Sequence, residues 1–190
     1  MSTQSQTRAG IRLMDTALPT LRMHEAYASE LIGDLCEEDL DMVPGVGHEN
    51  TPRFTIGHLC TGSALTRWVI ERPEEDKVGR LDIPEIYQEL FQRRGPADRR
   101  FPCAASDAPS GAELLEQLAY QHDLLDQSVR AAHDELLARP CAWKLGHLLK
   151  RHGDLIMFVC SHEALHLGQV ASWRRAMGLG AAMSRMIENR

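Results

Sequence analysis

Two histidines, His162 and His166, stand four residues apart in a stretch whose apolar residues recur at helical spacing. Residues at positions i and i+4 of an α-helix lie about 5–6 Å apart on one face, so both imidazoles can reach one ion. Burying two imidazoles is costly unless each ring nitrogen has a partner. The pair therefore predicts a site for one divalent transition metal, in preference to two core histidines that are hydrogen-bonded to other groups.

Two imidazoles alone hold an ion weakly, so a third ligand is expected from another helix. His58 lies near the start of a second helical pattern and is the first candidate. His24 and His122 fall on the apolar stripes of two further helices, and each is open as a fourth ligand, a support for a ligand or an ordinary core residue. The other histidines fall in loops or near helix ends and are interpreted as surface residues: His48, His133, His147 and His152.

Three neutral histidines would leave the ion with its full charge and an open coordination position, which is the pattern of a catalytic site. A metal in such a site lowers the pKa of a bound water or thiol and so generates a nucleophile at neutral pH. Glu163 follows His162 directly and is a weak candidate for a catalytic base, although it could equally hydrogen-bond a neighbouring helix or face solvent. Gln169, three residues after His166, could support a ligand or contact another helix.

The residues from His162 to His166 also spell H-E-x-x-H, the motif of zinc peptidases in which the glutamate is the general base. The next residues, Leu167-Gly168-Gln169, do not continue the pattern of the peptidases that use a third histidine. Glu188, which would have to serve as a distant glutamate ligand, lies close to the end of the chain, and no strand pattern precedes the motif. We therefore interpret the peptidase motif as a coincidence.

Four amphipathic helical patterns must position these residues, and no strand pattern is convincing. The predicted helices cover residues 18–38, residues 54–71, the stretch from the Ser110–Glu113 capping box to Pro140, and residues 154–177. The segment 73–109 holds many of the prolines and is interpreted as a crossover connection with a short helix over 83–94. The tail from residue 179 is expected to be loosely packed. The sequence thus predicts an all-α four-helix bundle, one domain over 1–190 with its core over 18–179.

The composition limits the function. Hydrophobic residues make up 43% of the chain and charged residues 25%, with a net charge of −6 and no basic block, so nucleic acid is not expected as a partner. No apolar run approaches the length of about 20 residues that a membrane helix needs. Residues 1–15 lack the apolar core of a signal peptide, so a cytoplasmic protein is expected. The cysteines form no pairing pattern and are expected to be free thiols, with three of them in the core: Cys36, Cys60 and Cys160.

The last predicted helix, over residues 154–177, resembles a helix of a known protein family. The run His162-Glu163-Ala164-Leu165-His166-Leu167-Gly168-Gln169-Val170, followed by Trp173-Arg174-Arg175 and Gly178-Leu179, resembles the last helix of the DinB-like (DinB/YfiT-like) superfamily of metalloenzymes. The segment Phe54-Thr55-Ile56-Gly57-His58-Leu59 is similar to the second helix of that family, which supplies the first ligand. The resemblance covers about residues 18–179.

This resemblance implies a four-helix bundle with an up-up-down-down order and a long crossover between the second and third helices. It implies a divalent metal, zinc or nickel before iron, bound by His58, His162 and His166, and often a homodimer. Characterised relatives include transferases that join small thiols such as bacillithiol or mycothiol to electrophiles, and an isomerase that uses mycothiol. The expected function is a metal-dependent transferase that activates a low-molecular-weight thiol, or water. The alternatives are a metal-dependent hydrolase and a non-catalytic metal-binding or interaction protein.

Overall fold

The computed structural model describes residues 13–48, 50–75, 77–92, 107–141 and 148–188. Within these ranges the secondary structure is helical and no strand is present, which confirms the all-α prediction. The helices are α1 (Leu13–Ile32), the short 3₁₀ helix η1 (Asp39–Asp41), α2 (Pro52–Glu71), α3 (Glu85–Phe91), α4 (Gly111–Ala131), α5 (Asp134–Ala138), α6 (Asp154–Ala176) and α7 (Ala182–Glu188). No helix in these ranges has both the length and the apolar character needed to cross a membrane.

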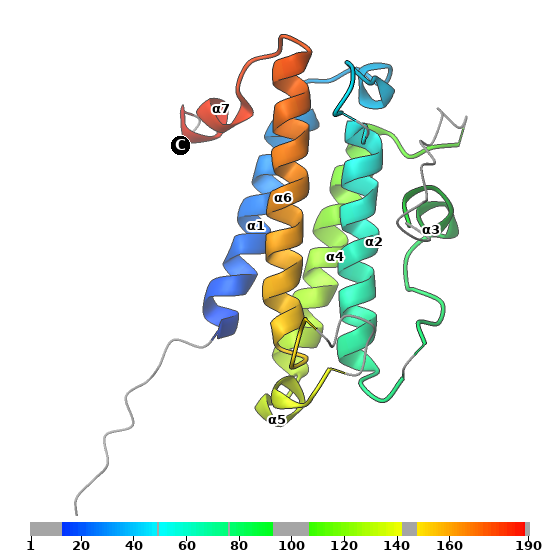
Figure 1. The fold of residues 1–190 in the computed structure, drawn as a ribbon, viewed down its shortest axis with the longest axis vertical. Helices are drawn as coiled ribbons and strands as arrows, with labels where there is room; N and C mark the ends of the chain where they lie inside the picture. The colour runs from blue at the N-terminus through cyan, green and yellow to red at the C-terminus, as the bar shows by residue number, and fades with distance from the viewer. Residues whose placement is uncertain (1–12, 49, 76, 93–106, 142–147, 189–190) are drawn as a thin grey trace, which may run out of the picture.

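Four long helices lie side by side (Figure 1): α1 contacts α4 and α6, and α2 contacts the same two helices. Their directions follow from hydrogen bonds at one end. Arg174, near the end of α6, donates to the carbonyl oxygen of Leu31 at the end of α1. Arg53, at the start of α2, donates to the carbonyl oxygens of Pro109, just before α4, and Glu37, just after α1. Helices α1 and α6 therefore run in one direction, and α2 and α4 run in the opposite one.

The expected up-up-down-down order is thus wrong, because the second helix runs antiparallel to the first. The short connection 33–51, which contains η1, turns the chain back at the end of the helices where α1 finishes. Since α2 and α4 are parallel, the chain between them must return along their length, and α3 lies within this connection. The crossover expected over 73–109 lies here, although residues 93–106 of it fall outside the described residues.

The start of α4 was predicted correctly and its end was not. The Ser110 hydroxyl accepts from the backbone N–H of Glu113, and the Glu113 carboxylate accepts from the N–H of Ser110, so the capping box is present. The helix ends at Ala131 instead of continuing to Pro140, because Ala132 and His133 adopt extended backbone conformations. The chain then forms α5, which buries Leu137. A local stripe of apolar residues cannot distinguish one long helix from two helices in sequence.

Three further expectations about burial are corrected by the structure. Cys36 is exposed, whereas Cys60 and Cys160 are buried as expected. His152, interpreted as a surface residue, is buried. The tail is not loosely packed, since α7 contacts α1 and buries Ala182. Cys103 and His147 lie outside the described residues.

The end of α6 is fixed by a buried guanidinium. Arg174 is 1% exposed and donates to the Leu31 carbonyl at 2.7 Å and to both carboxylate oxygens of Asp34, at 2.6 Å and 2.9 Å. Hydrogen bonds from Arg174, with help from Arg185, hold the pKa of Asp34 well below its usual range. These contacts join the end of α1 to α6 and α7, and they therefore fix the axial position of α6 relative to the neighbouring helices.

We expect Arg174→Leu to lower the free energy of unfolding by about 1.5–3 kcal/mol, because it removes the charged hydrogen bonds of a buried guanidinium to the Leu31 carbonyl and to Asp34, whose side chain is 44% exposed. Urea denaturation monitored by circular dichroism measures this loss. The adjacent Arg175 is exposed and serves as the control, since Arg175→Leu should change stability by less than about 0.5 kcal/mol. Equal losses in the two variants would show that the Asp34 pair contributes nothing specific.

Candidate metal centre

Three histidines from two helices meet at one point. His58 of α2 and His162 and His166 of α6 each offer a ring nitrogen, and these nitrogens lie within 4.8 Å of one another. All three side chains are half-buried. The separation of the His162 and His166 Nε2 atoms is 3.1 Å. The structure therefore brings together the three residues predicted as ligands, and a group of this kind can hold a metal ion.

Hydrogen bonds on the far side of two rings define which nitrogen can bind an ion. His58 Nδ1 lies 3.0 Å from the carbonyl oxygen of Phe91, at the end of α3. His166 Nδ1 lies 3.0 Å from Oε1 of Gln169, which also accepts from Asn50 Nδ2 at 3.3 Å. Because carbonyl oxygens only accept, each Nδ1 carries a proton, and in the neutral form of each ring the lone pair is then on Nε2. This is the tautomer that a metal-binding histidine needs, with its other nitrogen held by a carbonyl group.

The electrostatics also fit a cation. Burial lowers the pKa of His162, and the negative charge of Glu163 offsets only part of this effect. His162 is therefore a neutral imidazole at neutral pH, which is the form that binds a metal. Lone pairs on adjacent imidazoles repel one another unless a proton or a cation lies between them. The donor set, three neutral imidazoles, suits zinc, nickel and iron.

Aromatic rings restrict the orientation of the site. Phe54 stacks on His58 with ring centroids 5.7 Å apart, and Phe158 stacks on His162 at the same distance. Beside the histidines, Leu165 is one of the exposed apolar side chains of α6. Two of the imidazoles are thus packed against flat apolar surfaces, and the half-exposed group stays accessible to a small molecule.

The middle turns of α6 differ from the prediction, although the apolar residues of the predicted stripe, such as Val159 and Trp173, are buried as expected. The apolar stripe was expected to place His162 and His166 inward, but the fully interior positions of this turn belong to Glu163 and Leu167. The two histidines lie beside that interior stripe and face His58 of α2. The site therefore lies between α2 and α6 at their accessible edge and not deep in the core, which leaves room for an open coordination position.

Glu163 faces away from the three histidines, into the interior. It is 0% exposed, and its carboxylate accepts from His24 Nδ1 at 2.9 Å, His122 Nε2 at 2.8 Å and the Ser63 hydroxyl at 3.1 Å. These partners come from α1, α4 and α2, so this one carboxylate joins α6 to the three other long helices. His24 and His122 support the interior of the protein through Glu163 and do not join the three-histidine group.

Sequence reasoning missed three contributors to this arrangement. The Phe91 carbonyl belongs to the backbone and gives no signal in the sequence. Ser63 and Glu25 look like ordinary helix residues, and only the fold brings them to Glu163 and His122 respectively. Gln169 did give a signal, its position three residues after His166, and its amide holds that ring.

His122 is held in its charged form. Both ring nitrogens lie 2.8 Å from carboxylate oxygens, Nε2 from Glu163 and Nδ1 from Glu25, so both must donate. Burial lowers the pKa of His122, but the charges and hydrogen bonds of Glu163 and Glu25 outweigh it and raise the pKa to about 9. Burial likewise disfavours the Glu163 carboxylate, but His122 and His24 lower its pKa to about 2. The two groups form a buried ion pair.

This pair predicts a loss of stability in alkali. The pKa of His122 is about 9, above its ordinary value of 6.5, so its contribution is complete below the lower value and is lost as the pH rises through the higher one. The free energy of unfolding should therefore fall by up to about 1.4 kcal/mol per pH unit in this window. Urea denaturation of metal-free protein at several pH values measures the slope. His122→Gln should flatten it and the exposed-site control His133→Gln should not, whereas an unchanged slope in His122→Gln would assign it to other groups.

Gly57 allows α3 to approach the site. A Cβ atom at this position would lie 2.3 Å from Cδ2 of Phe91, far inside any allowed contact. Gly57→Ala should therefore displace Phe91, break its hydrogen bond to His58 and weaken metal binding by about 10–100-fold, the usual cost of losing such a support. Metal titration with a competing chelator measures this. Gly168→Ala is the control, because a Cβ there meets nothing within 4 Å. Similar affinities for the two variants would contradict a role for the Phe91 carbonyl.

Comparison with known proteins identifies the family of the chain. The sequence model of the DinB superfamily matches residues 20–170, most of the chain, including His58, His162 and His166. No curated protein matches the chain, and no solved structure does. The match extends from the first turns of α1 to the last turns of α6 and so covers all four long helices. The chain therefore belongs to the DinB superfamily.

Proposed function

We propose that this protein is a metal-dependent transferase that binds one divalent ion, zinc or nickel, at His58, His162 and His166 and acts on a low-molecular-weight thiol. The observation that carries the proposal is the convergence of three neutral imidazoles in a half-exposed group. We also take the four long helices to be a DinB-type four-helix bundle and the chain to be a single domain.

Different residues of the chain have different roles in such a site. A divalent cation bound there supplies Lewis acidity, which favours the anionic form of a thiol or water at neutral pH. Three neutral imidazoles bring no negative charge, so they leave this acidity undiminished. Phe91 and Gln169 hold two of the rings by hydrogen bonds. Our proposal gives Glu163 a structural part, because its carboxylate is bound by interior partners.

An open coordination position separates a catalytic site from a closed structural one. His24 and His122 were the candidates for a fourth ligand, and both are bound to Glu163. Neither joins the three-histidine group. This supports an enzyme over a non-catalytic metal-binding protein.

The test is metal-dependent consumption of a thiol. The protein, stripped of metal and reloaded with zinc or nickel, is mixed with a generic electrophile and with bacillithiol, mycothiol or glutathione in turn, and the remaining thiol is measured. We expect faster loss of one thiol with the loaded protein than with the stripped protein or with His166→Ala. No metal-dependent loss with any of the thiols would overturn the transferase proposal. Metal-dependent cleavage of an activated ester in the same experiment would favour a hydrolase.

We further propose that the protein forms a homodimer, as the resemblance implies. Exposed apolar side chains on α6, Met157 and Leu165, suit such a contact. Light scattering coupled to size-exclusion chromatography should give twice the mass of the chain, and a monomeric mass would contradict the proposal.

A further inference from the structure

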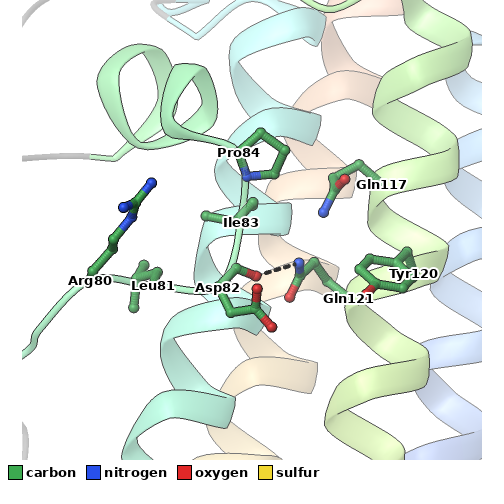
Figure 2. A pocket seen from close by; sticks show the side chains of 8 residues that line it. All are labelled: Arg80, Leu81, Asp82, Ile83, Pro84, Gln117, Tyr120 and Gln121. Carbon is green, nitrogen blue, oxygen red and sulfur yellow. Dashed lines mark hydrogen bonds between the residues drawn. The ribbon is translucent and has the colours of Figure 1, made fainter.

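A cavity of about 540 Å³ lies between the segment 80–84 and the outer face of α4. Figure 2 shows the segment on one side and Gln117, Tyr120 and Gln121 of α4 on the other. The cavity shares no lining residue with the three-histidine group. Its volume falls within the range of about 300–1,000 Å³ that is typical of sites for small molecules.

The wall of this cavity contains amide groups with unused hydrogen-bonding capacity. Gln121 is 0% exposed, and its Nε2 donates to the carbonyl oxygen of Asp82 at 3.0 Å (Figure 2). That bond fixes the orientation of the amide, and Oε1 of Gln121 is left buried with no hydrogen-bond partner in the described structure. One turn earlier, Nε2 of Gln117 is also buried without a partner among these residues. Buried polar atoms are nearly always paired, so an unpaired acceptor and an unpaired donor on successive turns of α4 require an explanation.

The two unused atoms define the chemistry of a ligand. Gln121 Oε1 can accept one hydrogen bond from an N–H, and Gln117 Nε2 can donate one to a carbonyl oxygen. A molecule that carries both an N–H and a C=O, such as a cyclic or primary amide, has the donor and the acceptor that these two atoms lack. Tyr120, which is 53% exposed, lines the same cavity and offers an aromatic surface to a flat ring.

The charges near the amides favour a neutral ligand. The Asp82 carboxylate forms an ion pair with Arg67 at 2.9 Å, so the two charges offset one another beside the amides. Arg80 also lines the cavity, at the side opposite to α4 (Figure 2). The ion pair beside Gln117 and Gln121 has no net charge, which favours a neutral ligand at these amides.

We propose that this cavity is a second binding site, separate from the metal centre, for a small neutral molecule with a cyclic or primary amide edge. Gln121 Oε1 accepts from the N–H of the ligand, Gln117 Nε2 donates to its carbonyl oxygen, and Tyr120 covers one face of the ring. The proposal does not depend on the function of the metal centre.

The test uses γ-butyrolactam as the probe and the full-length protein. Nuclear magnetic resonance follows the side-chain amide signals of isotope-labelled glutamine during a titration. We expect the Gln117 and Gln121 signals to shift together and saturate, with affinity at least about tenfold weaker for the N-methyl derivative, which lacks the N–H. Gln121→Met and Gln117→Met, which keep the side-chain length, should each lose binding, and His166→Ala should retain it.

Three results would overturn the proposal. The first is that neither signal shifts as the lactam is added. The second is that the N-methyl derivative binds as tightly as the lactam. The third is that both methionine variants bind the lactam as the wild type does. Gln117 is only half-buried, so Gln117→Met decides the matter if Gln121→Met does not fold.

Discussion

Alanine in place of His162 or His166 should reduce the affinity for zinc or nickel by more than about 100-fold, since even the loss of a supporting contact costs about 10–100-fold. Each substitution removes one of three nitrogens that lie within 4.8 Å of one another. The wild type, purified without a histidine tag, should contain about one equivalent of metal by elemental analysis. The double variant His162→Ala/His166→Ala should contain none, because a single remaining imidazole cannot hold the ion against competing ligands.

Two controls make this result specific. His133 is exposed and lies outside the group, so His133→Ala should keep the full equivalent of metal. His58→Ala tests the third ligand separately, and it should lose metal as severely as the two single variants on α6. A double variant that retains one equivalent would show that the ion binds elsewhere, and a wild type without metal after reloading would refute the site.

The sequence predicted what depends on local spacing. The pair His162 and His166 needs only a helix to converge, and the capping box at Ser110 is complete within four residues. The third ligand, His58, was proposed from a short motif, and the fold brings it to the pair. The histidine pair and the capping box were accessible because neighbours along one helix determine them, whereas the prediction of His58 depended on the family resemblance.

The rest depends on contacts between residues far apart in the sequence. The direction of α2 relative to α4 follows from Arg53, whose partner is a backbone carbonyl before α4. The rotation of α6 follows from Glu163, which sequence patterns would place on a polar face and which the structure buries because its partners arrive from three other helices. No periodicity reports such a set of partners. The predicted stripe is therefore correct at its apolar residues, such as Leu155 and Trp173, but it is one position away from the interior at His162 and His166.

The second large effect is expected at Glu163 itself. Glu163→Ala removes a carboxylate that accepts from His24, His122 and Ser63, and it leaves the charge of His122 with Glu25 alone. Loss of one partner from a buried charged network costs about 3–5 kcal/mol, so urea denaturation should show a large fall in the free energy of unfolding. Glu116 of α4 is exposed and provides the control, because Glu116→Ala should change stability by less than about 0.5 kcal/mol.

Glu163→Gln tests whether Glu163 affects the geometry of the metal centre in addition to its effect on packing. The amide keeps the shape of the side chain and one acceptor oxygen, so the variant should fold with a smaller loss of stability than Glu163→Ala. Its NH₂ group cannot accept a hydrogen bond from a histidine. The contacts that set the orientation of α6 about its axis, in the turn that carries His162 and His166, are therefore weakened. We therefore expect the folded variant to bind cobalt, used as a coloured substitute for zinc, about 10–100-fold more weakly and with an altered absorption spectrum. An unchanged affinity and spectrum would mean that apolar packing alone orients the two histidines, because a purely structural role for Glu163 changes stability without changing the coordination of the ion.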